Sequence, residues 1–122
     1  MSMSADIDRQ IAEARARMER SKAFRESTQS TRGRGEADGI RVEVDNSGRL
    51  ASIQLPQNLS VWSGDRLGPK IVAVTKLATA DLARKVQAQA IDTFGPEDAV
   101  TNRVRQELTE HFGDYEEGEF RG

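Results

Sequence analysis

The sequence predicts an α+β fold of order α-β-β-β-α, with a small antiparallel sheet and two long helices, followed by a short C-terminal helix and an acidic tail. Three observations favour this class: a helical stripe of apolar residues near the N-terminus, an alternating hairpin pattern over residues 40–55, and a second helical stripe over residues 68–94. A length of 122 residues, 36% hydrophobic and 31% charged, fits one small domain over residues 1–94 with C-terminal additions.

A first long helix is predicted over residues 5–26. Apolar residues recur there at steps of four and three, at Ile7, Ile11, Ala14 and Met18, which places them on one stripe. At 1.5 Å per residue such a helix is about 33 Å long, more than a domain of this size covers. We therefore expect it to project from the domain and to pair with another helix.

Three strands are predicted at about residues 27–32, 40–45 and 49–55. The first rests only on a run of serine and threonine residues, which favour extended backbone over helix. The other two form the clearest local signal in the chain, because apolar and polar residues alternate on both sides of the tight connection from Asp45 to Gly48. Pro56 ends the hairpin.

A second long helix is predicted over residues 68–94, opened by Pro69 and carrying apolar residues about four apart. Gly95 and Pro96 stop it, and a short helix over residues 95–112 follows. The acidic tail, residues 113–122, has no periodicity and is expected to be disordered.

The apolar stripes of the two helices exceed what one face of a three-stranded sheet covers, so a single copy would expose apolar surface. The sequence therefore predicts a homodimer. The only tryptophan is expected to anchor the loop between strands and helix. The residues assigned to the core or the dimer surface are Ile40, Val42, Val44, Ile53, Leu55, Trp62, Ile71, Val74 and Leu82.

Composition excludes several classes of function. The chain has no cysteine and one histidine, which rules out disulfides, zinc fingers and iron–sulfur clusters. His111 follows Glu107 and Glu110 on the short helix, but this set is weak evidence for a metal site, and no nucleophile motif accompanies it. No catalytic residue, metal or cofactor is predicted. No apolar run approaches a membrane span and the start does not have the order of a secretion signal, so we expect a cytoplasmic protein.

Charge is unevenly distributed although the net charge is only −2. Residues 1–35 carry eight basic and five acidic residues, and residues 95–122 carry three basic and eight acidic ones. The basic half indicates a surface for a polyanion such as the DNA backbone. The candidate contacts are Arg15, Arg17, Arg20, Lys22, Arg25, Arg32 and Arg34.

Each of these basic segments has a simpler interpretation. Glu13, Glu19 and Glu26 lie three or four residues from basic residues, so ion pairs along a solvated helix face are the alternative to DNA contacts. The run from Arg32 to Gly35, Arg-Gly-Arg-Gly, is compatible with a loop that approaches a phosphate and equally with a flexible hairpin loop kept soluble by arginine. The acidic tail is compatible with a shield for the arginines or with a solvating end.

The order of elements and several segments resemble the YbaB/EbfC family of nucleoid-associated proteins, particularly its actinobacterial-type members. The resemblance covers roughly residues 7–94. Its most specific part is the hairpin sequence Ser-Gly-Arg-Leu-Ala-Ser-Ile-Gln-Leu at residues 47–55, followed by Gly-Asp-Arg-Leu-Gly at residues 64–68. The resemblance implies a tweezer-like homodimer, with the sheet and second helix in the body and the first helices as arms, and DNA binding without enzymatic activity.

These observations lead to the hypothesis of a nucleoid-associated protein that binds double-stranded DNA as a homodimer with little sequence preference. The rival hypothesis is a dimeric adaptor or chaperone-like protein that holds a protein partner in the groove between its arms or on its apolar helix stripe. The near-neutral charge and the acidic tail motivate the rival.

Overall fold

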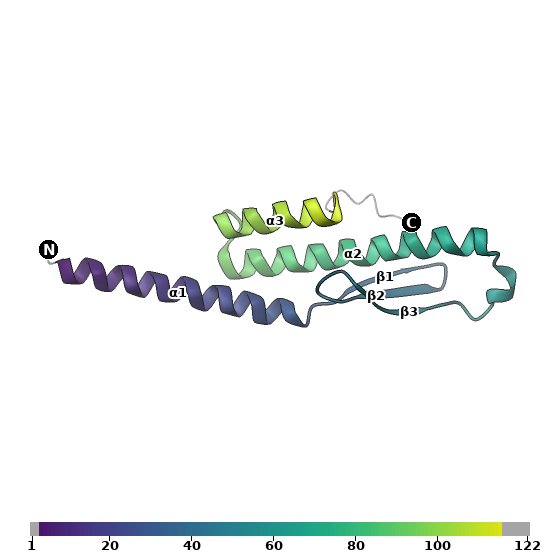
Figure 1. Cartoon of the computed structure of the whole chain (residues 1–122), viewed down its shortest axis with the longest axis horizontal. Coiled ribbons are helices and arrows are strands. Elements are labelled where there is room, and N and C mark those ends of the chain that lie inside the picture. Colours follow the sequence, from purple (N-terminus) through teal and green to yellow (C-terminus); the bar gives the residue numbers. More distant parts are fainter. Residues whose placement is uncertain (1–2, 116–122) are drawn as a thin grey trace.

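The first helix, α1, extends from the rest of the chain, whose other elements form two helical layers over a small sheet (Figure 1). The computed structural model describes residues 3–115. The helices are α1 (Met3–Gln29), α2 (Gly64–Phe94) and α3 (Ala99–Phe112), with the short 3-10 turn η1 (Leu59–Val61) before α2. The sheet is antiparallel with the order β1-β2-β3, formed by β1 (Gly33–Ala37), β2 (Ile40–Val44) and β3 (Leu50–Gln54). The predicted α+β class and element order are confirmed.

The first strand was predicted at residues 27–32, and this is wrong: α1 continues to Gln29 and β1 begins at Gly33. The hydroxyls of Ser27 and Thr28 donate hydrogen bonds to backbone carbonyls one turn earlier in α1, at 2.9 and 3.2 Å. These local bonds let short polar residues stay helical despite their preference for extended backbone.

The other helices also differ from their predicted bounds. α2 begins four residues before the predicted position 68, because Ser63 caps it by accepting a hydrogen bond from the backbone N–H of Arg66 at 3.3 Å. α3 begins at Ala99 rather than at 95, where Asp98 accepts from the N–H of Val100 at 2.8 Å. The sequence therefore indicated both helices, and side-chain caps set where they start.

The core lies between the sheet and α2. Ile40, Val42 and Val44 of β2 are fully or almost fully buried against Val74 and Leu82 of α2. A second cluster, formed by Ala80, Ala83, Leu108 and Tyr115, joins α2 to α3 and the residues that follow it. The hydrophobic stripe of α2 therefore packs on two sides, against the sheet and against α3.

Two residues assigned to the core or the dimer surface are exposed to solvent in the single chain. Ile53 is 39% exposed and Leu55 is 36% exposed. Ile53 pairs with Val42 in the sheet, yet α2 packs on β1 and β2 and leaves β3 at the far edge. Ile71 is half-buried against the core, and Trp62 is half-buried with the guanidinium of Arg66 over its ring at 4.6 Å. Trp62 does not belong to either of the two buried clusters.

The chain stays ordered past α3, so the predicted disorder of residues 113–122 is wrong at its start. Tyr115 is 1% exposed, its hydroxyl contacts the Gln87 side chain at 2.5 Å, and its carbonyl accepts from Arg84 at 3.1 Å. The remaining predicted tail, residues 116–122, lies outside the described residues.

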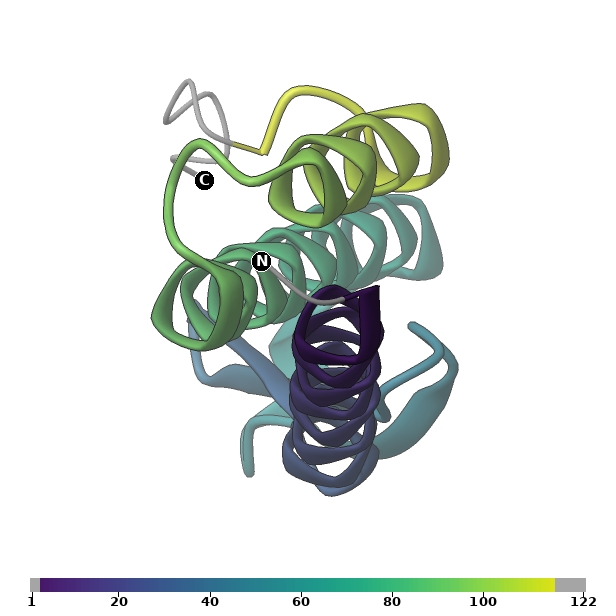
Figure 2. The same cartoon turned by 90° about the vertical axis from the view of Figure 1, so that its left-hand side faces the viewer.

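No residue of α1 is buried. Its contact with the rest of the chain is at its C-terminal end, where the rings of Phe24 and Phe94 meet edge to face at 5.5 Å and Gln89 donates to the carbonyl of Ser27 at 3.2 Å. Most of the helix extends beyond the body (Figure 1), and in the end-on view its N-terminal turns lie nearest the viewer (Figure 2). The N-terminal two thirds of α1 is therefore an arm, and residues 24–29 are its base.

Candidate nucleic-acid interface

The five basic candidates on α1 are all exposed. Within residues 3–115, none of their side chains forms a hydrogen bond or an ion pair, and the ion pair on the arm is that of Arg9 with Asp6 at 3.3 Å. The alternative pairs with Glu13, Glu19 and Glu26 do not form there. The candidates are Arg15, Arg17, Arg20, Lys22 and Arg25.

These side chains do not share one face of the helix. Arg17 and Arg25 border one shallow hollow along α1 beside Met18, whereas Arg15 borders another together with Asp8 and Glu19. The arm thus presents cations on more than one side, with acidic residues between them. Such an arrangement suits contacts to phosphates around the arm better than insertion of one recognition face into a groove.

The Arg-Gly-Arg-Gly run has a role that neither of its predicted interpretations included. It enters β1, and Gly33 and Gly35 face α2, where a Cβ at Gly33 would overlap the carbonyl oxygen of Ala78 and one at Gly35 would lie 2.5 Å from that of Val74. The glycines therefore allow the helix to pack directly on the strand. The run is not a phosphate-binding loop or a flexible hairpin loop.

Arg32 and Arg34 nevertheless come together in a hollow of about 450 Å³ where α1, β1 and α2 meet. Lys85 of α2 lines it too, although this residue was not among the predicted contacts. Lys85 donates to the carbonyl of Arg32 at 2.9 Å and pairs with Asp81 at 2.8 Å. A signal for Lys85 existed in the sequence, because it follows Asp81 by one helical turn.

The charges of this junction are largely balanced. Asp81 also accepts the backbone N–H of Arg34 at 2.8 Å, and the Arg34 guanidinium pairs with Glu43 at 3.4 Å. The Arg32 side chain, in contrast, has no hydrogen bond or ion pair within the described residues. Of the two predicted contacts at the base of the arm, Arg32 is therefore the available cation.

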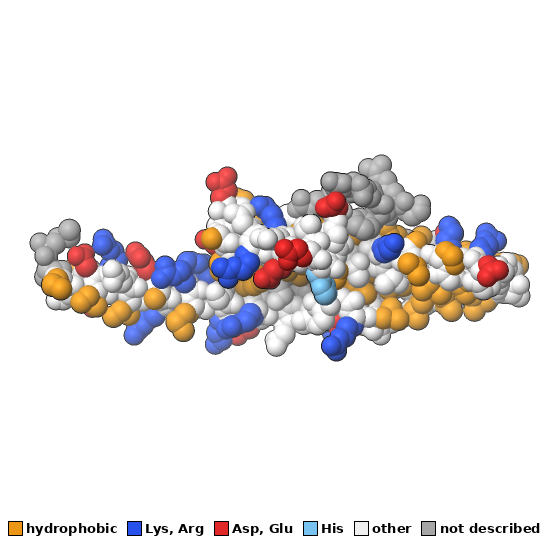
Figure 3. Space-filling model, turned by 45° about the horizontal axis from the view of Figure 1, so that its top comes forward, with side chains coloured by type: hydrophobic (Ala, Val, Ile, Leu, Met, Phe, Trp, Pro, Cys, Tyr) orange, Lys and Arg blue, Asp and Glu red, His pale blue; other side chains and the backbone are white. Residues whose placement is uncertain are grey.

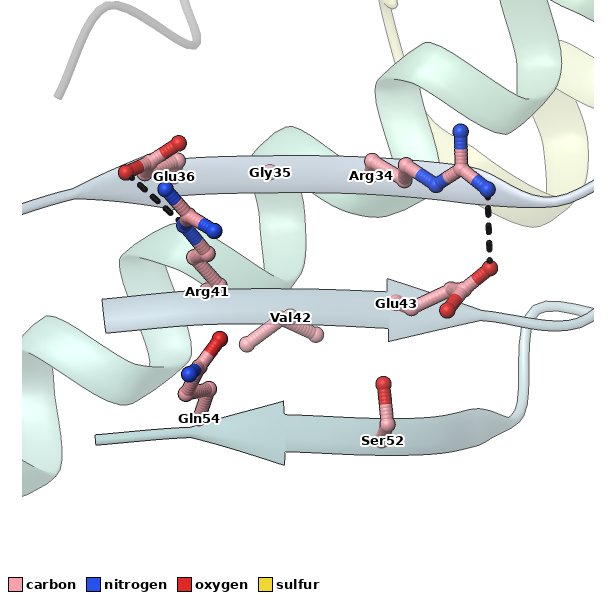
Figure 4. Close-up of a pocket in the computed structure, with 8 residues that line it drawn as sticks. All are labelled: Arg34, Gly35, Glu36, Arg41, Val42, Glu43, Ser52 and Gln54. Atoms are coloured by element: carbon pink, nitrogen blue, oxygen red, sulfur yellow. Dashed lines mark hydrogen bonds and ion pairs between the residues drawn. The ribbon is translucent and has the colours of Figure 1, made fainter. Parts of the chain in front are cut away.

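The face of the sheet that points away from α2 carries polar side chains in alternating charge (Figure 4). Arg41 pairs with Glu36 across the strands at 3.0 Å, as Arg34 does with Glu43. Ser52 and Gln54 of β3 complete the lining of a shallow hollow of about 480 Å³. This face is self-neutralised, so it offers little to a polyanion.

The single histidine lies beside an apolar pocket between α1, α2 and α3. The ring of His111 meets that of Phe112 edge to face at 4.6 Å, and the pocket, about 330 Å³, is also lined by Phe24, Val86 and Leu108. Among residues 3–115, no three carboxylate or imidazole side chains are close enough together to hold a metal ion.

Comparisons of the chain with protein-family models, curated proteins and solved structures gave no match. Within the described part of the chain, no helix has the length and apolarity that crossing a membrane requires.

Proposed function

We propose that the protein is a nucleoid-associated, cytoplasmic homodimer without enzymatic activity that binds double-stranded DNA with little sequence preference, as the resemblance to the YbaB/EbfC family suggests. The observation that supports it best is the arm: a long helix without a buried residue, on which the five basic candidates have no acidic partner within residues 3–115 and only Arg9 pairs with a carboxylate, that of Asp6. Cations held apart from their own carboxylates remain available for phosphates.

The expected lack of sequence preference follows from the distribution of these cations. Because they lie on several sides of α1, contacts with phosphates predominate over contacts with base edges. Arg32 at the base of the arm extends the same surface toward the body.

Self-association is supported by apolar side chains that the single chain leaves open. β3 exposes Leu50 and Ile53, and α2 exposes Val72. Association with a second copy would remove such side chains from water. A second copy of the chain is a partner that is present wherever the protein is.

A mobility-shift titration with a mixed-sequence duplex at salt concentrations from about 50 to 200 mM tests DNA binding. We expect affinity to fall steeply with salt. The double variant Arg17→Glu with Arg20→Glu should weaken binding at least tenfold. The plot of the logarithm of the binding constant against the logarithm of the salt concentration should also become less steep, by roughly 0.9 in slope for each phosphate that the variant no longer neutralises.

The matched control is Lys76→Glu with Arg103→Glu, which changes the charge equally at two exposed positions on α2 and α3. If the control weakens binding as much as the arm variant, net charge rather than the arm is responsible. No shift at about 50 mM salt rejects the proposal.

The rival function, an adaptor for a protein partner, is favoured by one specific observation: the arm exposes Ile7, Ile11 and Met18 by 46% to 70%. A pull-down from its own cell extract after nuclease treatment distinguishes the two functions. Partners bridged by DNA disappear on digestion, whereas a directly bound protein remains.

A further inference from the structure

Apolar side chains of the arm, three of them exposed, form a straight row. Ile7, Ile11, Ala14 and Met18 follow one another at steps of four, three and four, the spacing of a two-helix seam. Orange side chains run along the extended part of α1 in Figure 3. Ser4 and Ser21 continue the spacing at either end, so the apolar part of the row is bounded by polar residues.

We propose that this row binds the same row of a second copy in antiparallel orientation, with the twofold axis between Ala12 and Glu13. In this register Ile7 packs opposite Met18 of the partner subunit, and Ile11 opposite Ala14 of the partner subunit, each contact occurring twice. The proposal rests on the self-association proposed above, differs from a tweezer-like dimer in that the arms meet instead of the bodies, and does not depend on DNA binding.

Charge decides the orientation. Asp8 and Arg15 flank the row on one side, seven residues apart, too far to pair within one helix, and neither has an ion pair within residues 3–115. The antiparallel register brings Asp8 within about 3 Å, along the helix axis, of Arg15 of the partner subunit. A parallel pair instead places Arg17 near Lys22 of the partner subunit, where like charges repel.

The length of the arm also fits. The register pairs residues 4–21, about 27 Å of helix. The described ring contact between α1 and the body involves Phe24, just beyond this segment. Two arms therefore overlap along their extended part, with one body at each end of the pair.

Pairing of the two arms leaves part of their basic surface exposed to solvent. Arg9 and Arg20 lie on the side of α1 opposite the row. Arg15 is occupied by the Asp8 pair and is removed from the proposed DNA contacts. The paired arms then form a rod with cations on its two outer sides.

Disulfide cross-linking in the full chain tests the register, because the natural sequence contains no cysteine. Two single variants, Ile7→Cys and Met18→Cys, change exposed side chains. We expect a mixture of the two to cross-link several-fold more than either alone. In the proposed register each position is about 16 Å from its own copy, beyond the reach of a disulfide, but lies opposite the other position.

Arg9→Cys mixed with Met18→Cys is the matched control, and it should not cross-link because Arg9 is on the outer side. Asp8→Arg should reduce the mixed cross-link, and adding Arg15→Asp should restore it. Cross-linking of each variant with itself would overturn the antiparallel register in favour of a parallel one.

A solution mass for the unmodified chain separates the remaining outcomes. A dimeric mass without the mixed cross-link overturns the arm pairing and leaves the proposed homodimer in place. A monomeric mass at high concentration without cross-links rejects both. The mixed cross-link in a protein that does not shift DNA supports the pairing and rejects the DNA-binding function.

Discussion

At the scale of single residues, Gly33 and Gly35 show why a motif can mislead. Both glycines face α2, and their missing side chains are what allow β1 to approach the helix backbone. The Arg-Gly-Arg-Gly sequence also fits a phosphate-binding loop, because glycine lets the backbone come close to a ligand just as it lets the backbone come close to a helix. Only the position of α2 distinguishes the two, and that position depends on residues far away in the chain, such as Ala78 and Leu82.

Replacing Gly33 with alanine should destabilise the fold by about 3 kcal/mol, because the new Cβ overlaps the Ala78 carbonyl and forces α2 off the strand. Urea unfolding followed by circular dichroism measures this. The control is Gly64→Ala at the start of α2, where a Cβ meets nothing within 4 Å and the stability should change by less than about 0.5 kcal/mol. Equal stability of Gly33→Ala and the natural chain would refute the close packing.

At the scale of elements, hydrophobic periodicity predicted helices and strands correctly wherever no local hydrogen bonds favoured a different structure. The long helices and the hairpin have strong patterns, and they form. The predicted strand at 27–32 rested on propensity alone, and the hydroxyls of Ser27 and Thr28 satisfied helical carbonyls instead. Alternation placed Ile53 on the same face as Val42, but it carries no information on how far one helix extends across a sheet.

The turn between β2 and β3 gives a pH-dependent prediction. The carboxylate of Asp45 accepts the backbone N–H groups of Arg49 and Ser47 at 3.0 and 2.8 Å, and these bonds lower its pKa below the usual 3.8. A lowered pKa means that the stabilisation is complete above pH 3.8 and is lost as the pH falls further.

Asp45→Asn should therefore be less stable than the natural chain at neutral pH, and the difference should shrink as the pH falls below 3.8. Thermal unfolding of both proteins across this range measures it. Asp114→Asn, in the exposed segment after α3, removes a carboxylate without changing the turn at Asp45 and serves as the control. A difference that stays constant with pH would contradict the role of the carboxylate.

At the scale of the whole molecule, the arm and the body are nearly separate. The sequence predicted an overlong first helix from length alone, and α1 extends with no buried residue. Charge alone identifies the basic candidates, whereas the structure distributes them over several sides of α1. Lys85 and Arg32 meet only because the end of α1, β1 and α2 converge, which local sequence does not encode.

Removing residues 1–20 should leave the body folded, with a free energy of unfolding within about 1 kcal/mol of the natural chain, because nothing in the described part of this segment is buried. The same truncation should abolish the shift of DNA. Removing residues 99–122 is the contrasting control, since it uncovers Ala80 and Ala83 of α2 and should cost several times more. An unfolded body after the first truncation would show that the arm supports it.

An arm without tertiary contacts has a thermodynamic consequence. In proteins most helical stability comes from the packing of an apolar face, and the arm has no such packing within the single chain. The contact between Phe24 and Phe94 anchors one end of α1, and no residue of the turns before it is buried. Helix formation in the arm is then coupled to the binding of a partner. A partner that binds the helical arm therefore stabilises that helix.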